Sequence, residues 1–135
     1  MAKYKKKLDA DIRCPLEYGL TIFGGKSGEY PQKLYKALMN SQTVLTVWDD
    51  ARLVGLIRVL DDSEMLAQIH YVLVHPEYQG QGIAGRMVEY IKEKYKNFMY
   101  LELMPEDKNN VPFYEKHGFH VMENGAAMQI CNNIN

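Results

Sequence analysis

The stretch that most constrains the fold, residues 70–95, joins a strand to a helix through glycines. Residues 70–74 alternate and are rich in β-branched side chains, and Pro76 ends the predicted strand. Apolar side chains then recur at helical spacing over residues 83–95. The junction at 79–84 reads Gln-Gly-Gln-Gly-Ile-Ala. Glycines let a ligand approach the backbone closely, and the free N–H groups of a first helical turn attract anions. The stretch therefore predicts a phosphate-binding site.

Length and charge narrow the possible function classes. A chain of 135 residues with a net charge of −1 predicts one domain over residues 1–135 and no basic field that would attract nucleic acid or an anionic membrane. The lysine cluster at residues 3–7 is interpreted as a solvated end rather than a nucleic-acid arm. Since no apolar run reaches about 18 residues and no signal peptide is recognisable, we expect a cytoplasmic protein.

Cysteine and histidine spacing argues against metal chemistry. Cys14 and Cys131 lie near opposite ends, which excludes a disulfide framework and a spaced zinc motif. We expect both thiols to be reduced and structural; a catalytic thiol would need a histidine beside it. His70 and His75 fall on opposite faces of the predicted strand, and Gly118 separates the other two histidines. No metal site is predicted.

Periodicity along the rest of the chain predicts a mixed α/β fold. Three consecutive strands joined by Asp-containing turns predict an antiparallel meander, and a strand–helix–strand unit over residues 65–104 predicts a parallel or splayed pair. The fold class is therefore α/β (α+β), with a mostly antiparallel central sheet and about four flanking helices. The expected strands are 4–8, 43–48, 53–60, 65–74, 98–104, 119–122 and 126–130, and the expected helices are 14–23, 31–40, 83–95 and a short one capped by Asn110 and ended by Gly118.

The glycine loop is compatible with more than one interpretation of its ligand. Gly80, Gly82 and Gly85 satisfy the dinucleotide pattern G-x-G-x-x-G, and Glu102 follows about twenty residues later. Against that oxidoreductase interpretation, residues 76–79 separate the strand from the first glycine, and the remaining chain is too short to complete a doubly wound sheet. A glycine-rich turn without a ligand is a further alternative.

Three motifs carry a family resemblance. Gln79-x-x-Gly82-x-Ala84 follows a strand, Leu-Val-His-Pro precedes it at 73–76, and Phe-Tyr-Glu-Lys-His-Gly-Phe stands at 113–119. Over roughly residues 31–122 the chain resembles the GCN5-related N-acetyltransferases. The resemblance implies that the loop binds the pyrophosphate of acetyl-CoA and that the pantetheine arm lies along the preceding strand. The coenzyme-binding residues implied in this way are Val72, Leu73, Val74, Gln79, Gly80, Gln81, Gly82, Ile83, Ala84, Gly85, Asn110 and Tyr114.

Acetyl transfer to an amine makes three chemical demands. An alkyl amine with a pKa of about 10.4 must lose a proton, which costs roughly 4 to 5 kcal/mol at neutral pH unless a base assists. The thioester oxygen gains charge and needs a fixed donor, for which a backbone amide near Leu73 or Val74 is the candidate. The departing thiolate needs a proton. Tyr114 matches the family tyrosine that commonly supplies it; the alternative is a core aromatic residue.

The general base is expected on one of two strands. Many family members place a glutamate on the strand that corresponds to residues 65–74 or on the next one, and the strand at 65–74 has none. His70 is the favoured substitute, because residues 70–75 look like the corresponding strand of aralkylamine N-acetyltransferases, and imidazole has a suitable pKa. Alternation places His70 and Tyr71 on opposite faces. Glu102 on the following strand is the competing base.

The sequence therefore predicts an acetyl-CoA-dependent N-acetyltransferase. It would move an acetyl group to a primary amine of a small molecule or peptide, by direct attack in a ternary complex. The alternative is a CoA-thioester-binding sensor or subunit with the same fold and no turnover. A homodimer formed through the C-terminal strands is possible, and the acceptor is not identifiable from the sequence.

Overall fold

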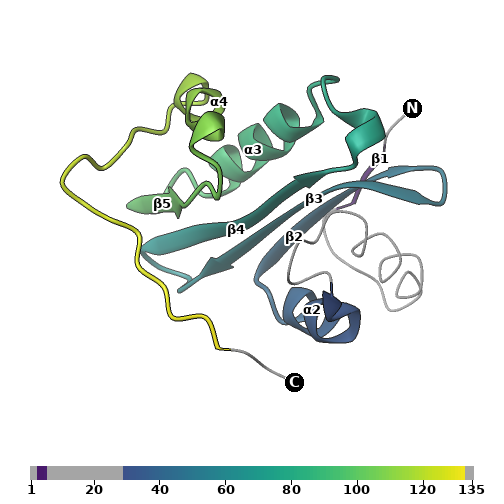
Figure 1. Cartoon of the computed structure of the whole chain (residues 1–135), viewed down its shortest axis with the longest axis horizontal. Coiled ribbons are helices and arrows are strands. Elements are labelled where there is room, and N and C mark those ends of the chain that lie inside the picture. The colour runs from purple at the N-terminus through teal and green to yellow at the C-terminus, as the bar shows by residue number, and fades with distance from the viewer. Residues whose placement is uncertain (1–2, 6–28, 133–135) are drawn as a thin grey trace. The chain divides into compact units, whose positions relative to one another are not determined.

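The computed structural model describes residues 3–5 and 29–132 (Figure 1). The chain forms two compact units, one up to Leu103 and one from Met104. The helix expected at residues 14–23 lies outside the described residues, so it stays a prediction.

The first unit contains a five-stranded sheet whose strands follow one another in chain order. The first four strands pair antiparallel and the last pair is parallel, which confirms the predicted meander and the parallel pair (Figure 1). The pairing follows from runs of buried β-branched and aliphatic residues separated by tight turns. The strands are β1 (Lys3–Lys5), β2 (Thr43–Asp49), β3 (Arg52–Asp61), β4 (Leu66–Val74) and β5 (Tyr100–Leu103).

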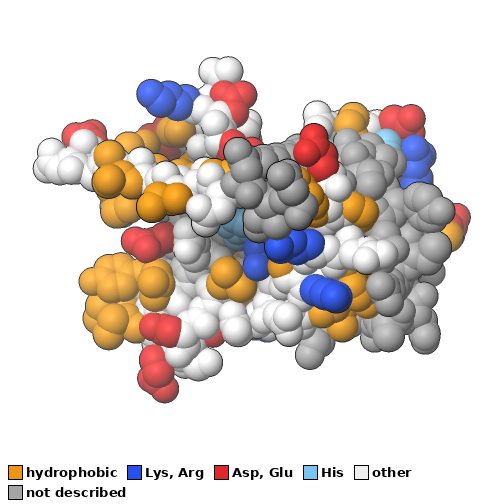
Figure 2. Space-filling model, turned by 60° about the horizontal axis from the view of Figure 1, so that its bottom comes forward, with side chains coloured by type: hydrophobic (Ala, Val, Ile, Leu, Met, Phe, Trp, Pro, Cys, Tyr) orange, Lys and Arg blue, Asp and Glu red, His pale blue; other side chains and the backbone are white. Residues whose placement is uncertain are grey.

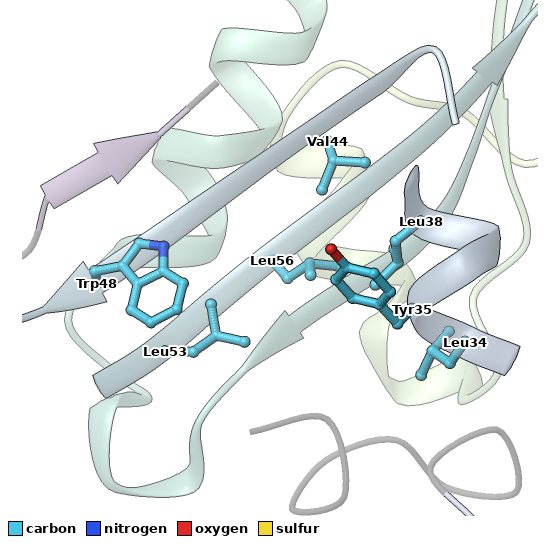
Figure 3. Close-up of a cluster of buried hydrophobic side chains, with 7 residues drawn as sticks. All are labelled: Leu34, Tyr35, Leu38, Val44, Trp48, Leu53 and Leu56. Atoms are coloured by element: carbon cyan, nitrogen blue, oxygen red, sulfur yellow. The ribbon is translucent and has the colours of Figure 1, made fainter. Parts of the chain in front are cut away.

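Two helices cover opposite faces of this sheet (Figure 1). On one face, α2 (Pro31–Met39) packs three side chains against β2 and β3. On the other, α3 (Ile83–Lys94) buries its apolar side, and Cγ2 of Ile83 lies close to Gly55 of β3. Neighbouring residues of a strand point to opposite faces, so Leu56 meets α2 while Gly55 meets α3. Figure 3 shows the α2-side cluster, formed by Leu34, Tyr35, Leu38, Val44, Trp48, Leu53 and Leu56.

The second unit contains a short helix and an extended C-terminal segment. After the 3₁₀ turn η4 (Lys108–Asn110), α4 (Val111–Lys116) forms as expected and ends before Gly118. Asn110 stands at the N-cap position, but its side chain caps no N–H group. The expected helix is therefore confirmed, whereas the expected capping bond is absent.

The C-terminal hairpin expected at residues 119–130 is wrong, because no strand follows Leu103 in the described part of the chain. Only the turn bond from the N–H of Gly125 to the carbonyl of Met122, 3.1 Å long, survives at the predicted turn. An isolated two-stranded hairpin is marginal unless a face is buried. Here the side chains that would form that face are exposed, with Met128 at 93% and Ile130 at 88% of full exposure.

Candidate functional site

The junction between η3 and α3 presents main-chain N–H groups. Gly80 and Gly82 have φ angles of +80° and +82°, a left-handed backbone that favours glycine. Gly82 is the N-cap of α3 and no side chain caps the helix. The first helical bond runs from the N–H of Arg86 to the carbonyl of Gly82, 3.1 Å long. The N–H groups of the three residues before Arg86 therefore have no carbonyl acceptor within the helix, and the positive end of its dipole lies behind them.

The space around these glycines is open. A Cβ added to Gly80 or Gly82 would meet nothing within 4 Å. These two positions therefore need glycine for backbone conformation, and the outer side of the turn is left accessible to a ligand. The free N–H groups, the helix dipole and the open space together give this junction the properties of a phosphate-binding site.

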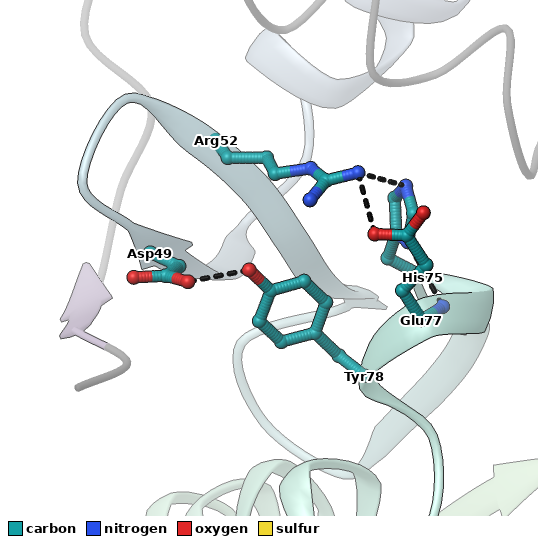
Figure 4. A network of polar contacts seen from close by, with 5 residues as sticks. All are labelled: Asp49, Arg52, His75, Glu77 and Tyr78. Carbon is teal, nitrogen blue, oxygen red and sulfur yellow. Dashed lines mark hydrogen bonds and ion pairs between the residues drawn. The ribbon is translucent and has the colours of Figure 1, made fainter.

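A polar network holds the segment that leads into this junction (Figure 4). The hydroxyl of Tyr78, at the end of η3 (Pro76–Tyr78), donates to Asp49 at the end of β2. Arg52 of β3 forms an ion pair with Glu77, 2.9 Å between Nη2 and Oε2. The hydrogen bond to Asp49 raises the pKa of Tyr78. The network ties the β2–β3 turn to η3, so it positions the glycine junction that follows.

His75 belongs to this network and has a structural role. It is buried, and its Nδ1 accepts the N–H of Glu77 at 3.1 Å, which caps η3. The main-chain N–H of His75 donates to the carbonyl of Val54 at 2.8 Å, which extends the pairing of β4 with β3.

The far part of β4 has an edge that β5 does not cover. The parallel pairing ends at Ile69 and Leu103, five residues before Val74 ends β4. Beyond Ile69, the main-chain groups on this side of β4 therefore have no partner in β5. The sequence resemblance predicts the pantetheine arm along this part of β4.

The pairing of His75 with Val54 indicates which groups face outward. In an antiparallel ladder, alternate residues direct both main-chain polar groups to the same neighbouring strand. Since the N–H of His75 faces β3, that of Leu73 does too, and Val72 and Val74 face the open edge. The side chain of Gln79 donates to the carbonyl of Val74 at 3.2 Å. The outward N–H groups of Val72 and Val74 are thus better placed to meet a ligand than that of Leu73.

β4 contains a β-bulge at His70. Arg58 of β3 pairs with Tyr71 while the next residue, Val59, pairs with Ile69, so His70 is the extra residue. The rings of His70 and Tyr71 lie edge to face with centroids 4.3 Å apart, and Tyr71 packs against the α2-side cluster. The expectation that simple alternation places these two side chains on opposite faces is wrong, because the bulge interrupts the alternation.

Arg58 is a site residue that the sequence reasoning missed. Its Nη1 lies 2.7 Å from Nδ1 of His70, and its Nε donates to Oγ of Ser41 at 2.8 Å. A guanidinium can only donate, so Nδ1 of His70 accepts and the proton of the neutral ring lies on Nε2. Figure 2 shows Lys and Arg side chains gathered near the middle of one face of the molecule, next to a histidine side chain. The available signal was a single charged residue within the apolar run at 53–60.

Comparison with known proteins decides the family. A profile of the acetyltransferase (GNAT) family matches residues 16–119, more than half of the chain. The chain belongs to this family. An uncharacterised N-acetyltransferase from the lysA 3' region of Bacillus methanolicus is 34% identical over 117 residues, which cover 86% of this chain and 92% of that relative. The predictions of a GNAT fold and of an acyltransferase are thereby confirmed.

Two further similar proteins have acetyltransferase names. A probable acetyltransferase from meticillin-resistant Staphylococcus aureus superposes with a TM-score of 0.79 and 28% identity, covering 98% of this chain and all of that one. An uncharacterised ycf52-like N-acetyltransferase of Prochlorococcus marinus is 28% identical over 99 residues. The match covers 70% of this chain but only 55% of that longer protein.

The remaining predicted residues of this GNAT chain lie on β5 and α4. Glu102 is half-buried on β5 and pairs with Gln68 of β4. Tyr114 is half-buried on α4 in the second unit, where its ring contacts Phe113 and Phe119 with centroids 5.0 and 6.0 Å away. Burial raises the pKa of Tyr114, so its hydroxyl keeps its proton at neutral pH.

Residues 29–132 bring no three His, Cys, Asp or Glu side chains together in an arrangement that could hold a metal ion. Over the same residues, every helix is too short or too polar to cross a membrane.

Proposed function

We propose that this GNAT protein is an acetyl-CoA-dependent N-acetyltransferase that acts on a primary amine of a small molecule or peptide. The amine attacks the thioester directly while both substrates are bound. The observation that carries the proposal is the uncapped start of α3, presented by left-handed Gly80 and Gly82 next to the open edge of β4.

The coenzyme would be held mainly by main-chain groups. The N–H groups of Ile83, Ala84 and Gly85, supported by the helix dipole, would receive the pyrophosphate. Val72 and Val74 would pair with the amides of the pantetheine arm as an added strand would. An outward N–H group of this edge would also stabilise the oxyanion that forms during attack. These assignments deepen the predicted set, of which Gln81 and Asn110 remain predictions without a specific contact.

The amine must lose its proton, and the contacts of His70 bear on which group takes it. Arg58 engages Nδ1 of His70, which leaves Nε2 protonated and without a lone pair for a base. This favours Glu102, acting through water, over His70. Glu102→Gln should therefore remove the acidic limb of the pH–rate profile, and His70→Gln should preserve it. The opposite result would assign the role to His70.

Tyr114 would protonate the departing thiolate. Its raised pKa keeps the hydroxyl protonated, and a thiol with a pKa of about 8.5 is the stronger acid, so the tyrosine acts as donor only as the thiolate develops.

The test is an amine panel followed by release of free CoA thiol. Tyr114→Phe should lower turnover at least about tenfold while CoA still binds, because only the hydroxyl is lost. Tyr100→Phe removes a hydroxyl from an exposed tyrosine and serves as the control. Unchanged turnover in Tyr114→Phe would remove this residue from the mechanism. A wild-type protein that binds acetyl-CoA and acetylates no amine would instead be a sensor.

A further inference from the structure

Arg58 carries a positive charge in the interior of β3, and none of the carboxylates that the structure describes forms an ion pair with it. By contrast, Arg52 at the start of the same strand pairs with Glu77 at 2.9 Å. Arg58 is half-buried, and burial lowers its pKa, but a guanidinium stays charged at neutral pH. A charge withdrawn from water and left unpaired is costly, so this one calls for an anionic ligand.

The guanidinium is also held in a fixed orientation. Nε donates to Ser41, whose hydroxyl donates to the carbonyl of Ala37 at 2.8 Å, and Nη1 donates to His70. The Cζ atom lies 5.8 Å from the centroid of the Tyr71 ring. These contacts leave the Nη2 amino group without an acceptor among the described residues. The guanidinium of Arg58 is thus oriented before an anion binds, which reduces the conformational entropy lost on binding.

The position of Arg58 in the sheet is close to the part of β4 where the acetyl group is expected to bind. Arg58 pairs with Tyr71, one residue before Val72, where the outward main chain of β4 begins. One strand residue spans about 3.3 Å, so an anion at Arg58 would lie close to a thioester at that edge. α3 occupies the opposite face of the sheet, while Arg58, like Tyr71, lies on the α2 side.

We propose that Arg58 binds an anionic group of the acetyl acceptor, a carboxylate or a phosphate located a few bonds from the reacting amine. The inference rests on the proposed N-acetyltransferase function and specifies its substrate class. Polyamines and simple alkyl or arylalkyl amines would be poor acceptors, because they bring positive charge or no charge to an unpaired guanidinium. His70 is then a positioning residue, whose Nδ1 helps to orient Arg58.

The experiment compares acceptors that share a skeleton and differ in the anionic group. Propylamine is paired with β-alanine for the carboxylate, and ethanolamine with phosphoethanolamine for the phosphate. In the wild type, kcat/KM should be about 10- to 100-fold higher for an anionic acceptor than for its partner, as for one charged hydrogen-bonded contact. The pair with the larger ratio distinguishes carboxylate from phosphate.

Variants assign the preference to Arg58. Arg58→Gln should abolish it by raising the KM of the anionic acceptor, with the affinity for CoA unchanged, and Arg58→Lys should restore part of it. Ser41→Ala keeps the charge but removes one orienting bond, so it should give a smaller loss and covers the case that Arg58→Gln fails to fold. Lys92→Gln removes one positive charge from the exposed side of α3 and is the matched control.

The outcomes separate this inference from the function. Equal kcat/KM for both members of each pair, or a preference that survives Arg58→Gln, would overturn the anionic acceptor while leaving the acetyltransferase intact. Absence of turnover with every amine would overturn the function. In that case calorimetry of the CoA-loaded protein with β-alanine and phosphoethanolamine decides the anion site: binding lost in Arg58→Gln supports it, and no binding overturns it.

Discussion

The hydroxyl of Tyr95 lies 2.5 Å from Oδ2 of Asp61 and joins the end of α3 to the end of β3. The same hydroxyl lies 2.6 Å from Oγ1 of Thr43 at the start of β2. Tyr95 is 4% exposed, and it ends the helix whose opposite end is the proposed phosphate site. This contact therefore fixes the helix at the end opposite the proposed phosphate site.

Tyr95→Phe should destabilise the protein without changing its chemistry. The substitution keeps the ring and removes the hydroxyl, which leaves buried Thr43 and the carboxylate of Asp61 without this partner. We expect a loss of about 1 to 3 kcal/mol in the free energy of unfolding, measured with urea. Tyr100→Phe at an exposed position should change it by less than about 0.5 kcal/mol. Equal effects of the two substitutions would contradict a structural role for the Tyr95 contacts.

The same residue predicts a pH dependence of stability. Burial, followed by the hydrogen bond to Asp61, raises the pKa of Tyr95 from 10.0 to about 12. The folded state then holds the phenolic proton more tightly than the unfolded state. This contribution to stability is present below pH 10 and is lost as the pH rises from 10 to about 12. Urea unfolding across this interval should show a smaller pH dependence in Tyr95→Phe than in the wild type, and identical slopes would refute the assignment.

Gly55→Ala should disturb the coenzyme site from behind the sheet. A Cβ at position 55 would lie 3.1 Å from Cγ2 of Ile83 and 3.2 Å from Cβ of Val47, and neither neighbour is a flexible chain end. We expect a loss of about 1 to 3 kcal/mol in stability and weaker CoA binding, because the first turn of α3 must shift. The effects of Gly55→Ala and Ile83→Ala should not add: Gly55→Ala should cost less stability in the Ile83→Ala background than in the wild type, because the nearest contact of the new Cβ is then gone. Full CoA affinity in a folded Gly55→Ala protein would show that the start of α3 is not positioned by this contact.

Tyr78→Phe should weaken CoA binding while leaving global stability nearly unchanged. It removes the hydrogen bond from η3 to Asp49. Most of the sheet does not contact this turn, so its contribution to the free energy of unfolding should stay the same. We expect the Kd for CoA to rise by about three- to tenfold, as for one hydrogen bond that orders the preceding loop. Calorimetry gives the affinity and urea unfolding the stability. A large fall in stability would instead make this network part of the core.

The spacing of apolar residues was sufficient to predict the helices and strands that bury one face. The helix at 31–40 and the three strands from 43 to 74 were predicted to within a few residues, because their apolar spacing alone decides which side is buried. The glycine junction was also identified, since the need for a left-handed backbone at Gly80 and Gly82 is local. The local sequence is therefore sufficient to predict the left-handed glycine junction that we propose as the coenzyme loop.

Features that depend on two distant segments were not predictable. The bulge at His70 arises from the register of β4 against β3, and it changes which face each side chain occupies. The contacts of Arg58 with Ser41 and His70 join residues 17 and 12 positions apart. The turn signal at Asn124 and Gly125 predicted a hairpin, but a turn does not form strands without a surface to bury them.

The central claim is that the pyrophosphate of CoA is held by main-chain N–H groups at the start of α3. The most direct test is calorimetric titration with CoA and with pantetheine, which lacks the phosphates, of the wild type, Gly82→Ala and the control Gly125→Ala. Ala at position 82 strains a left-handed backbone, while the space around Gly125 admits a Cβ with ordinary contacts.

We predict that the wild type binds CoA far more tightly than pantetheine, and that Gly82→Ala weakens CoA binding on the order of tenfold or more with little effect on pantetheine. Gly125→Ala should behave as the wild type. Equal affinities of the wild type for CoA and pantetheine, or full CoA affinity in Gly82→Ala, would contradict the account.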